Sequence, residues 1–341
     1  MNKRIFKNQT TDKGDVPFFK ISTFGKKADS FISNNLFEKY KEKYPYPQKG
    51  DLLISASGSI GRIVEYKGQK AYYQDSNIVW LNHNKELLNI YLKAYYQVIH
   101  WHGIEGSTIK RLYNKNILAT SIFVPDKKEQ YELGKLIKKA EKIISLQQRR
   151  LESFQFTYHE IIRRLFLKKA KWQQTKLSDL VTILDKNRKP VKKEDRLFGD
   201  TPYYGANGIQ DYISGFTHKG EFILIAEDGA NNLTEYPIYF VKGQIWVNNH
   251  AHVLKVNKDV SPLFLTLALK QINYSKYTVG SSRNKLNLKD LENIAIFIPD
   301  NNEQQKIGQF YSNYLNYLRI NKKRIQYMKQ FKQFLLQNMF I

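Results

Sequence analysis

The chain has 341 residues, of which 42% are hydrophobic and 14% aromatic, enough for two hydrophobic cores and a helical connection between them. It contains no cysteine, which excludes disulfides and thiolate metal sites and fits a reducing compartment. No apolar run approaches the length of a membrane span, and the N-terminus has no signal-peptide pattern. We therefore expect a soluble cytoplasmic protein with no membrane partner.

The charge is strongly positive. The sequence has 55 basic and 31 acidic residues, a formal net charge of +24 at pH 7. Residues 1–125, 126–171, 172–299 and 300–341 carry +9, +7, +3 and +5, so the excess is spread along the whole chain. A polyanion that contacts every part of the protein is the simplest partner, because phosphate contacts supply most non-specific affinity for nucleic acids. A generally basic composition without such a partner is the alternative.

The first segment, residues 1–13, is polar and basic, and we expect it to be frayed. Residues 14–19 (Gly-Asp-Val-Pro-Phe-Phe) then start a strand-rich domain, and residues 199–204 (Gly-Asp-Thr-Pro-Tyr-Tyr) start a second one. Two similar starts in one chain indicate a duplicated unit. The segments between these starts and the next shared motif differ in length, as expected for two readers of different sequences on one scaffold or for duplicates that have drifted.

Each domain has a buried strand followed by a loop of small residues. Residues 50–55 predict a strand, 56–62 a glycine-containing loop and 63–66 a returning strand, and residues 220–226 and 227–232 are their counterparts. Neither loop has the Lys-Ser/Thr ending of a nucleotide P-loop or the spacing of a Rossmann turn, so hairpin turns are favoured over phosphate cradles. A short helix follows in each domain, near 87–99 and 262–271.

A second shared motif lies just before the end of each domain. Residues 106–112 (Gly-Ser-Thr-Ile-Lys-Arg-Leu) and 280–286 (Gly-Ser-Ser-Arg-Asn-Lys-Leu) are separated by 174 positions. Hydroxyls, backbone amides, Lys and Arg hold phosphates, and Arg or Asn can also bind base edges. A solvated loop needs no function, but the recurrence of these residue types in both domains of a basic chain favours nucleic-acid contact.

Each domain ends in a long helix. Residues 122–130 (Ile-Phe-Val-Pro-Asp-x-x-Glu-Gln) and 296–304 (Ile-Phe-Ile-Pro-Asp-x-x-Glu-Gln) announce the two helices, and their Asp-x-x-Glu pattern predicts a capping box. Steps of four and three residues then predict a coiled-coil seam in each helix. The first seam is Leu133, Ile137, Ala140, Ile144, Gln147, Leu151, Phe154, Tyr158, Ile161 and Leu165; the second lies 174 positions further on, from Ile307 to Met339.

The two helices should pair with each other, because at about 1.5 Å per residue each is too long to be covered by one small domain. Antiparallel pairing about a pseudo-twofold axis brings their midpoints together, near Gln147 and Asn321. We predict that these two polar side chains meet and fix the register. The expected fold is α+β: two mixed α/β domains (1–125 and 170–299) separated by two long antiparallel coiled-coil helices (126–169 and 300–341).

This pattern resembles the specificity subunit of type I restriction-modification systems. The resemblance covers nearly the whole chain and depends on the repeated domain starts and the two Pro-x-x-x-Glu-Gln helices. Residues 172–180 (Trp-Gln-Gln-Thr-Lys-Leu-Ser-Asp-Leu) are also similar to the start of a target recognition domain in that family. The first domain departs from the family pattern, with only 13 residues before Gly14 and no counterpart of that segment. A misplaced start or a native shortening would each explain this difference, and a native shortening would put the edge strand and the DNA contacts of the first domain in doubt.

The resemblance implies a non-catalytic protein. Each target recognition domain would read one half of a split, asymmetric site in double-stranded DNA, while the helices dock two methyltransferase subunits. The cofactor S-adenosylmethionine would be bound by those subunits and not by this chain, and restriction/translocase subunits would join the complex. In agreement, the sequence has no Asn-Pro-Pro or Asp-Pro-Pro methylase motif, and its two Pro-Asp pairs lack the downstream residues of a nuclease.

The candidate DNA contacts combine hydrogen-bonding capacity or positive charge with a position near the repeated motifs. In the first domain they are Lys20, Ser22, Thr23, Arg62, Thr108, Lys110 and Arg111; in the second they are Lys186, Asn187, Arg188, Lys189, Tyr204, Asn207, Ser282, Arg283, Asn284 and Lys285. We expect Arg283 to be a base contact in the half-site of the second domain.

Histidines do not indicate an enzyme. The pairs His100/His102 and His250/His252 alternate as residues on one strand face do, but with no cysteines or clustered carboxylates nearby in the sequence we expect no metal site. Residues 248–250 either contact bases or form a turn. The rival function is a stand-alone scaffold that coats nucleic acid without sequence preference and self-associates through its helices.

Overall fold

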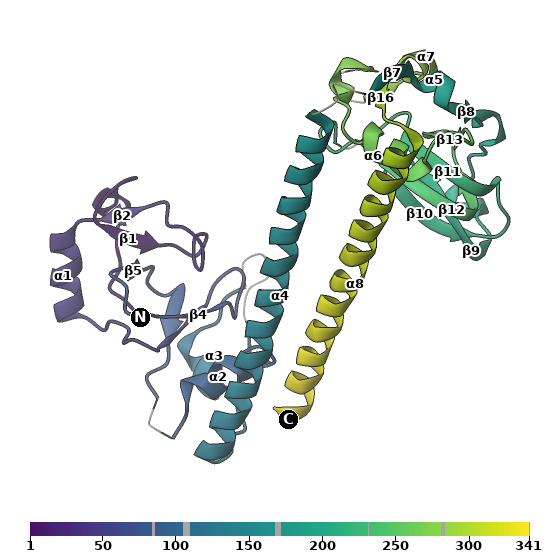
Figure 1. Cartoon of the computed structure of the whole chain (residues 1–341). Helices are drawn as coiled ribbons and strands as arrows, with labels where there is room; N and C mark the ends of the chain where they lie inside the picture. The colour runs from purple at the N-terminus through teal and green to yellow at the C-terminus, as the bar shows by residue number, and fades with distance from the viewer. Residues whose placement is uncertain (84–85, 105–109, 168–171, 231, 281–283, 341) are drawn as a thin grey trace. The chain divides into compact units, whose positions relative to one another are not determined.

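The computed structural model describes residues 1–83, 86–104, 110–167, 172–230, 232–280 and 284–340. The chain divides into two compact units, Met1–Gln148 with Lys323–Ile341, and Arg149–Lys322. Each unit holds one strand-rich domain and one half of each long helix, α4 (Lys127–Leu167) and α8 (Asn301–Met339) (Figure 1).

The first unit contains two small sheets. In one, β1 (Val16–Phe19) lies between antiparallel β2 (Phe31–Ile32) and parallel β5 (Tyr72–Tyr73); in the other, β3 (Leu52–Ser55) lies between antiparallel β4 (Ile63–Glu65) and β6 (Ile78–Trp80). The 3-10 turn η1 (Lys7–Gln9) and the helices α1 (Asn34–Lys43), α2 (Asn89–Tyr95) and α3 (Asn114–Ala119) complete it. Tyr91 and Tyr95 of α2 pack on Ile137 of α4 and on Leu336 and Phe340 near the end of the chain.

The second unit is built on a larger sheet. Its order is β10 (Gly208–Ile213), β9 (Phe198–Gly205), β12 (Ile238–Val247), β11 (His218–Ala226), β13 (Ala251–Val256) and β8 (Val181–Ile183). The smaller pairs are β16 (Ala295–Ile298) with β7 (Gln173–Lys176), and β14 (Thr278–Val279) with β15 (Lys285–Leu286). The helices are α5 (Leu177–Leu180), α6 (Pro262–Leu269) and α7 (Leu288–Glu292), and the 3-10 turns are η3 (Asp185–Asn187), η4 (Lys193–Asp195) and η5 (Tyr274–Lys276).

The two domains repeat one strand arrangement. The motif Pro-aromatic-aromatic forms β1 in one and part of β9 in the other, and each of these strands pairs in parallel with a later strand of its domain. Phe18 lies opposite Tyr72, and Tyr203 lies opposite Trp246. The duplication predicted from the two starts is therefore present in the strand pairing.

Both long helices begin with the same capping contacts. The carboxylate of Asp126 accepts a hydrogen bond from the amide of Glu129 at 2.9 Å, and Asp300 accepts one from Glu303 at 2.9 Å. The following glutamine, Gln130 in α4, is buried and accepts from the backbone amide of Leu88 at 2.8 Å. This glutamine ties the start of the long helix to the start of the short one.

The second copy has the same glutamine contact and a shared glycine. Gln304 of α8 is buried and accepts from the amide of Ser261, the residue before α6, at 3.0 Å. One turn further on, a Cβ at Gly308 would lie 2.8 Å from Ser261 Oγ, and a Cβ at Gly134 would lie 2.6 Å from the carbonyl carbon of Ile90. Glycine at this position lets each long helix approach a short helix closely.

The predicted seams are correct along most of the helices but wrong at their C-terminal ends. Ile137, Ile144, Leu151 and Tyr158 are buried as expected, whereas Ile161 is 47% exposed and its neighbour Ile162 is buried. In α8 the same shift by one residue makes Leu336 and Phe340 the buried positions, in place of Leu335 and Met339. Beyond Tyr158 the buried residues recur every four positions, because they pack on a globular domain and no longer in a heptad seam.

Within each unit the helix halves run antiparallel. Tyr158 stacks on Tyr314 with a ring-centroid distance of 3.4 Å in the second unit, and Glu141 pairs with Lys332 at 3.2 Å in the first. The contact between Gln147 and Asn321 stays a prediction; the amide of Asn321 donates to Tyr317 O in its own helix at 2.8 Å.

The expectation of a frayed N-terminus was wrong. Asn2 is buried and its amide donates to Tyr73 O at 3.2 Å, while the Tyr72 hydroxyl donates to Lys3 O at 3.1 Å. Thr11 forms a β-bridge with Phe31. The prediction failed because the polar composition of this segment gives no indication of its hydrogen bonds to β2 and β5.

Candidate nucleic-acid interface

In each domain the small-residue loop after the buried strand meets the second shared motif. In the second domain these two segments form what we call the domain-two loop site, residues 227–229 with 284–286. Three backbone contacts join the two segments. The amide of Gly229 donates to Asn284 O at 3.2 Å, the amide of Leu286 donates to Glu227 O at 2.7 Å, and Asp228 forms a β-bridge with Lys285. The glycine loop after β11 is thus fixed against the basic motif.

The first domain has the same three contacts in its own loop site, residues 56–58 with 110–112. The amide of Gly58 donates to Lys110 O at 3.1 Å, and the amide of Leu112 donates to the carbonyl oxygen of residue 56 at 2.8 Å. Ser57 forms a β-bridge with Arg111. One backbone framework therefore presents a basic pair or an Asn-Lys pair beside a small-residue loop in both domains.

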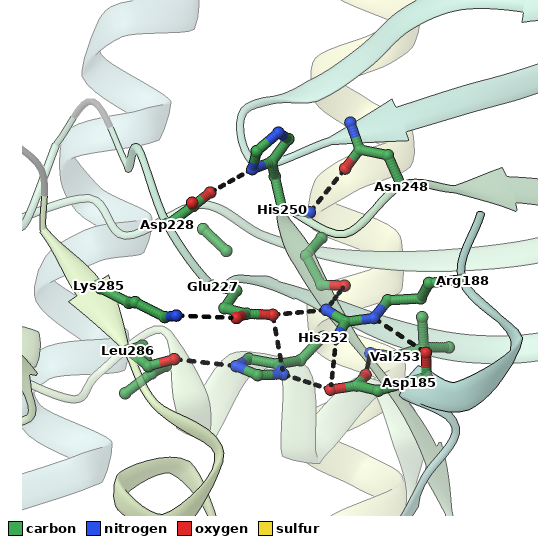
Figure 2. Close-up of polar contacts among 12 residues, drawn as sticks. Asp185, Arg188, Glu227, Asp228, Asn248, His250, His252, Val253, Lys285 and Leu286 are labelled. Atoms are coloured by element: carbon green, nitrogen blue, oxygen red, sulfur yellow. Dashed lines mark hydrogen bonds and ion pairs between the residues drawn. The ribbon is translucent and has the colours of Figure 1, made fainter. Parts of the chain in front are cut away.

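A charged cluster lies beneath the domain-two loop site (Figure 2). The Arg188 guanidinium is its centre: Nη1 donates to Glu227 Oε2 at 2.6 Å and to Ala251 O at 3.0 Å. Its Nη2 lies 3.3 Å from Asp185 Oδ2, and Nε donates to the Asp185 carbonyl at 3.1 Å. Lys285 Nζ lies 3.6 Å from the other oxygen of Glu227. The side chains of Arg188, Asp185 and Glu227 are only 15%, 14% and 17% exposed.

His252 closes the cluster from β13. Its Nδ1 lies 2.6 Å from Asp185 Oδ2, and its Nε2 donates to Leu286 O at 3.0 Å. Burial by itself would raise the pKa of Asp185, but the hydrogen bond and charge of His252, the amide of Val253 and the charge of Arg188 together hold that pKa below its usual value. The cluster thus links η3, β13 and the basic motif.

Asp185, Glu227 and His252 have the composition of a metal site, and their ligand atoms lie within 4.8 Å of one another. The donor set does not fit a cation. Arg188 lies between the two carboxylates and pairs with both, and each nitrogen of His252 already faces an oxygen acceptor. A metal would have to displace a guanidinium that balances the same charges, so we interpret the group as an ionic cluster.

The first domain has apolar side chains at the matched positions. Ala56 corresponds to Glu227, and Val79, which lies opposite Ile54 in the sheet, corresponds to His252, which lies opposite Ile225. Ala56 and Val79 are buried in one apolar cluster. Beside them is a cavity of about 320 Å³, lined among others by Met1, Ala56, Asn77 and Arg111.

The predicted contacts of the second domain gather around the loop site or flank it. Lys186, Asn187 and Lys189 are exposed on η3 and just beyond it. The Asn207 amide donates to Gly229 O at 2.9 Å, and the backbone of Asn284 is part of the loop site. Tyr204 is half-buried, and burial raises the pKa of its hydroxyl, which therefore stays protonated. Ser282 and Arg283 lie outside the described residues.

The predicted contacts of the first domain form a comparable group. Lys110 and Arg111 are exposed on the loop site, and Arg62 Nη1 donates to Phe24 O at 2.9 Å, beside the turn that contains the remaining candidates. In that turn Ser22 is exposed, Lys20 pairs with Asp29 at 2.9 Å, and the buried Thr23 hydroxyl accepts from the amide of Lys20 at 3.1 Å. Thr108 lies outside the described residues.

One argument from the sequence was wrong. Carboxylates do cluster near His250 and His252, because Asp185, Glu227 and Asp228 are brought there by strand pairing and not by sequence spacing. The signal that could have indicated this is the Glu-Asp pair directly after the buried strand β11, a position where apolar or small residues are expected.

The fold is that of a duplicated protein, with two α/β domains joined to two long helices and the same loop contacts built in each domain. A family model described as the type I restriction modification DNA specificity domain matches residues 1–154 and 169–330. The chain belongs to this family.

Relatives with assigned names match parts of the chain. A Haemophilus influenzae sequence assigned as a type I restriction enzyme specificity subunit is 54% identical over 142 residues, which cover 41% of this chain and 37% of that protein. The EcoprrI specificity subunit of Escherichia coli is 29% identical over 100 residues, or 29% of this chain and 24% of the relative. In each case the chain spans less than half of the relative's length.

Solved structures share the fold. The S subunit of a type I restriction-modification system from M. genitalium is 17% identical and superposes with a TM-score of 0.64, covering 100% of this chain and 92% of that one. A chain from a study of complex assembly and conformational transition of the type I R-M system gives a TM-score of 0.55 at 13% identity, covering 94% of this chain and 90% of that one.

Among the described residues, no helix has the length and apolar character needed to cross a membrane.

Proposed function

We propose that this chain is the sequence-specific DNA-binding subunit of a type I restriction-modification complex, with each domain reading one half of a bipartite, asymmetric site. The observation that carries the proposal is the loop site, built twice from the same backbone contacts. One scaffold used twice with different side chains is what two unlike half-sites require. Two identical sites would predict a palindromic target and identical loops.

The charges at the loop sites support contact with DNA. Lys110 and Arg111 are exposed in the first domain, and the Lys285 side chain is 49% exposed in the second. These cations have the chemistry of phosphate contacts, which position a protein on the duplex but are the same for every sequence. Together with a net charge of +24, they predict binding that weakens steeply as salt is added.

The outer faces of the long helices support docking of two copies of one partner. Leu136 and Leu146 of α4 are 40% and 53% exposed, and 174 positions further on Phe310 and Ile320 of α8 are 41% and 51% exposed. Exposed apolar side chains at equivalent places in a repeated structure fit one binding surface presented twice. We assign this pair of surfaces to two methyltransferase subunits, which would bind S-adenosylmethionine.

The chain itself has a non-catalytic role in this proposal. The charged cluster under the domain-two loop site is closed by mutual pairing, which suits a positioning role better than proton transfer or metal chemistry. Restriction/translocase subunits would bind the assembled specificity and methyltransferase subunits. Such a complex acts on DNA in the cytoplasm.

The test is co-expression with its methyltransferase subunit in a methylation-deficient host, followed by single-molecule sequencing of the genome. A two-part asymmetric methylated motif that requires both proteins is the expected result. Leu146→Asp together with Ile320→Asp should abolish copurification of the methyltransferase without changing DNA binding by the free chain. Methylation by the partner alone, or a motif that is not bipartite, would refute the proposal.

The alternative, a scaffold without sequence preference, is favoured only by the spread of positive charge along the chain. It predicts equal affinity for all duplexes of one length and no association with a methyltransferase. A competition assay with random-sequence DNA distinguishes the two functions.

A further inference from the structure

His250 and Asn77 occupy matched positions beside the two loop sites. In the second domain the amide of Glu227 donates to the carbonyl oxygen of His250 at 2.9 Å. In the first domain the amide of Ala56 donates to the carbonyl oxygen of Asn77 at 2.8 Å. The same backbone contact therefore places two different hydrogen-bonding side chains next to the same kind of loop.

The imidazole of His250 is held in one orientation (Figure 2). Its Nδ1 lies 2.5 Å from Asp228 Oδ1, and its backbone amide donates to Asn248 Oδ1 at 2.8 Å. The His250 side chain is 36% exposed, and within the described part of the chain its Nε2 has no hydrogen-bond partner. The ring is thus fixed through one nitrogen and offers the other to a ligand.

Asn77 borders a cavity in the first domain. It is half-buried and, with Arg111, lines the cavity of about 320 Å³ in the first domain. Asparagine presents a donor and an acceptor together, the pair of groups that matches the major-groove edge of adenine. Its surroundings therefore leave room for a group that approaches the first loop site.

The residue types at matched positions distinguish contacts that position the protein on DNA from contacts that determine its sequence specificity. Arg111 and Lys285 are matched and both basic, as expected for a phosphate contact that is needed in either half-site. His250 and Asn77 are matched but differ in hydrogen-bonding pattern. A difference of this kind beside a constant cation is expected where two domains read different bases, because base edges differ in their donors and acceptors whereas phosphates do not.

We propose that His250 contacts a base edge in the half-site read by the second domain, with Asp228 as the positioning residue that orients its ring, and that Asn77 contacts a base in the other half-site. This inference rests on the proposed function and assigns the specificity-determining side chains within it. Asn248 is excluded from the contact, since it is buried and its side-chain oxygen holds the turn.

The experiment compares methylated motifs formed by variants of the full chain co-expressed with the methyltransferase. His250→Ala should relax one or two base positions in one half of the motif, lowering the preference there by roughly 5- to 100-fold, and leave the other half unchanged. Asn77→Ala should relax the opposite half. His250→Asn, which introduces the residue type of the first domain, should change the preferred base, and Asp228→Asn should relax the same positions as His250→Ala to a smaller extent.

Each result is decisive. Lys285→Ala is the matched control, because loss of a phosphate contact lowers methylation at all sites alike and leaves the motif intact. An unchanged motif in His250→Ala, or relaxation of both halves together, overturns the inference while leaving the proposed function in place. If the unmodified chain yields no bipartite motif, the proposed function itself fails and this inference fails with it. Thermal unfolding of each purified variant shows that the fold is retained.

Discussion

Arg188 is the residue for which sequence and structure suggest different roles, and Arg188→Ala distinguishes them. The sequence places it among basic DNA contacts, whereas the structure directs its guanidinium to Asp185, Glu227 and the carbonyl of Ala251. Removing it leaves two carboxylates, each less than a fifth exposed, without their shared cation. Breaking a buried ion pair costs about 3–5 kcal/mol, and the lower end applies because His252 and Lys285 remain as partial partners.

A loss of about 3 kcal/mol in a unit of this size corresponds to a fall in Tm of roughly 6–12 °C. Thermal unfolding without DNA measures it, with Lys186→Ala as the matched control. Lys186 is exposed on the same turn, so its removal should change the free energy of unfolding by less than about 0.5 kcal/mol. It should instead reduce the slope of log binding constant against log salt concentration for DNA binding by about one. The positioning role is refuted if Arg188→Ala keeps the Tm within about 2 °C of the unmodified chain and instead reduces the slope of log binding constant against log salt concentration by about one.

Two further predictions concern the close helix contact and the cluster's pH dependence. Gly134→Ala should destabilise the first unit by about 1–3 kcal/mol in thermal unfolding, because a Cβ would meet the backbone of Ile90 at 2.6 Å. Gly308→Ala should cost less, since its nearest obstacle at 2.8 Å is a side-chain hydroxyl, that of Ser261, and not the backbone; a raised Tm for Gly134→Ala would contradict the packing argument. Because the folded state lowers the pKa of Asp185, its stabilising contribution is present above the usual carboxyl pKa of about 3.9 and is lost as pH falls through the folded value. Acid titration of the unfolding free energy should therefore be flatter in Asp185→Asn, and an unchanged titration would show that this carboxylate is not responsible.

The long helices could be predicted from sequence because their signals are local. A capping Asp, a heptad pattern and an identical spacing of 174 residues all lie within or between contiguous segments. The role of the glutamine that follows the capping box could not, since its partners, Leu88 for Gln130 and Ser261 for Gln304, lie 42 and 43 residues away. The seam prediction was wrong near the helix ends for a related reason, because the globular domain that packs on each helix end determines which residues are buried there.

The candidate site was predicted in part. Residues 284–285 were identified because they belong to a repeated motif, and their neighbours Glu227 and Asp228 were missed because a single acidic pair has no periodicity. Their contacts follow from the pairing of β11 with β13, which sets Ile225 opposite His252. Register of that kind depends on the whole sheet and cannot be obtained from spacing alone.

On the same backbone, the second domain has an ionic cluster where the first domain has an apolar one. We expect that no single substitution can convert one cluster into the other without loss of stability. Val79 is buried among apolar side chains, so Val79→His would place an imidazole where its nitrogens find no carboxylate of the kind that Asp185 supplies to His252. The expected cost is about 3 kcal/mol, from lost apolar burial and an unsatisfied polar group. The converse change, His252→Val, leaves Asp185 and the carbonyl of Leu286 without their imidazole partner and should cost a similar amount. Each substitution copies the residue that works in the other domain, so thermal unfolding in which either is neutral would show that the clusters are not cooperative sets.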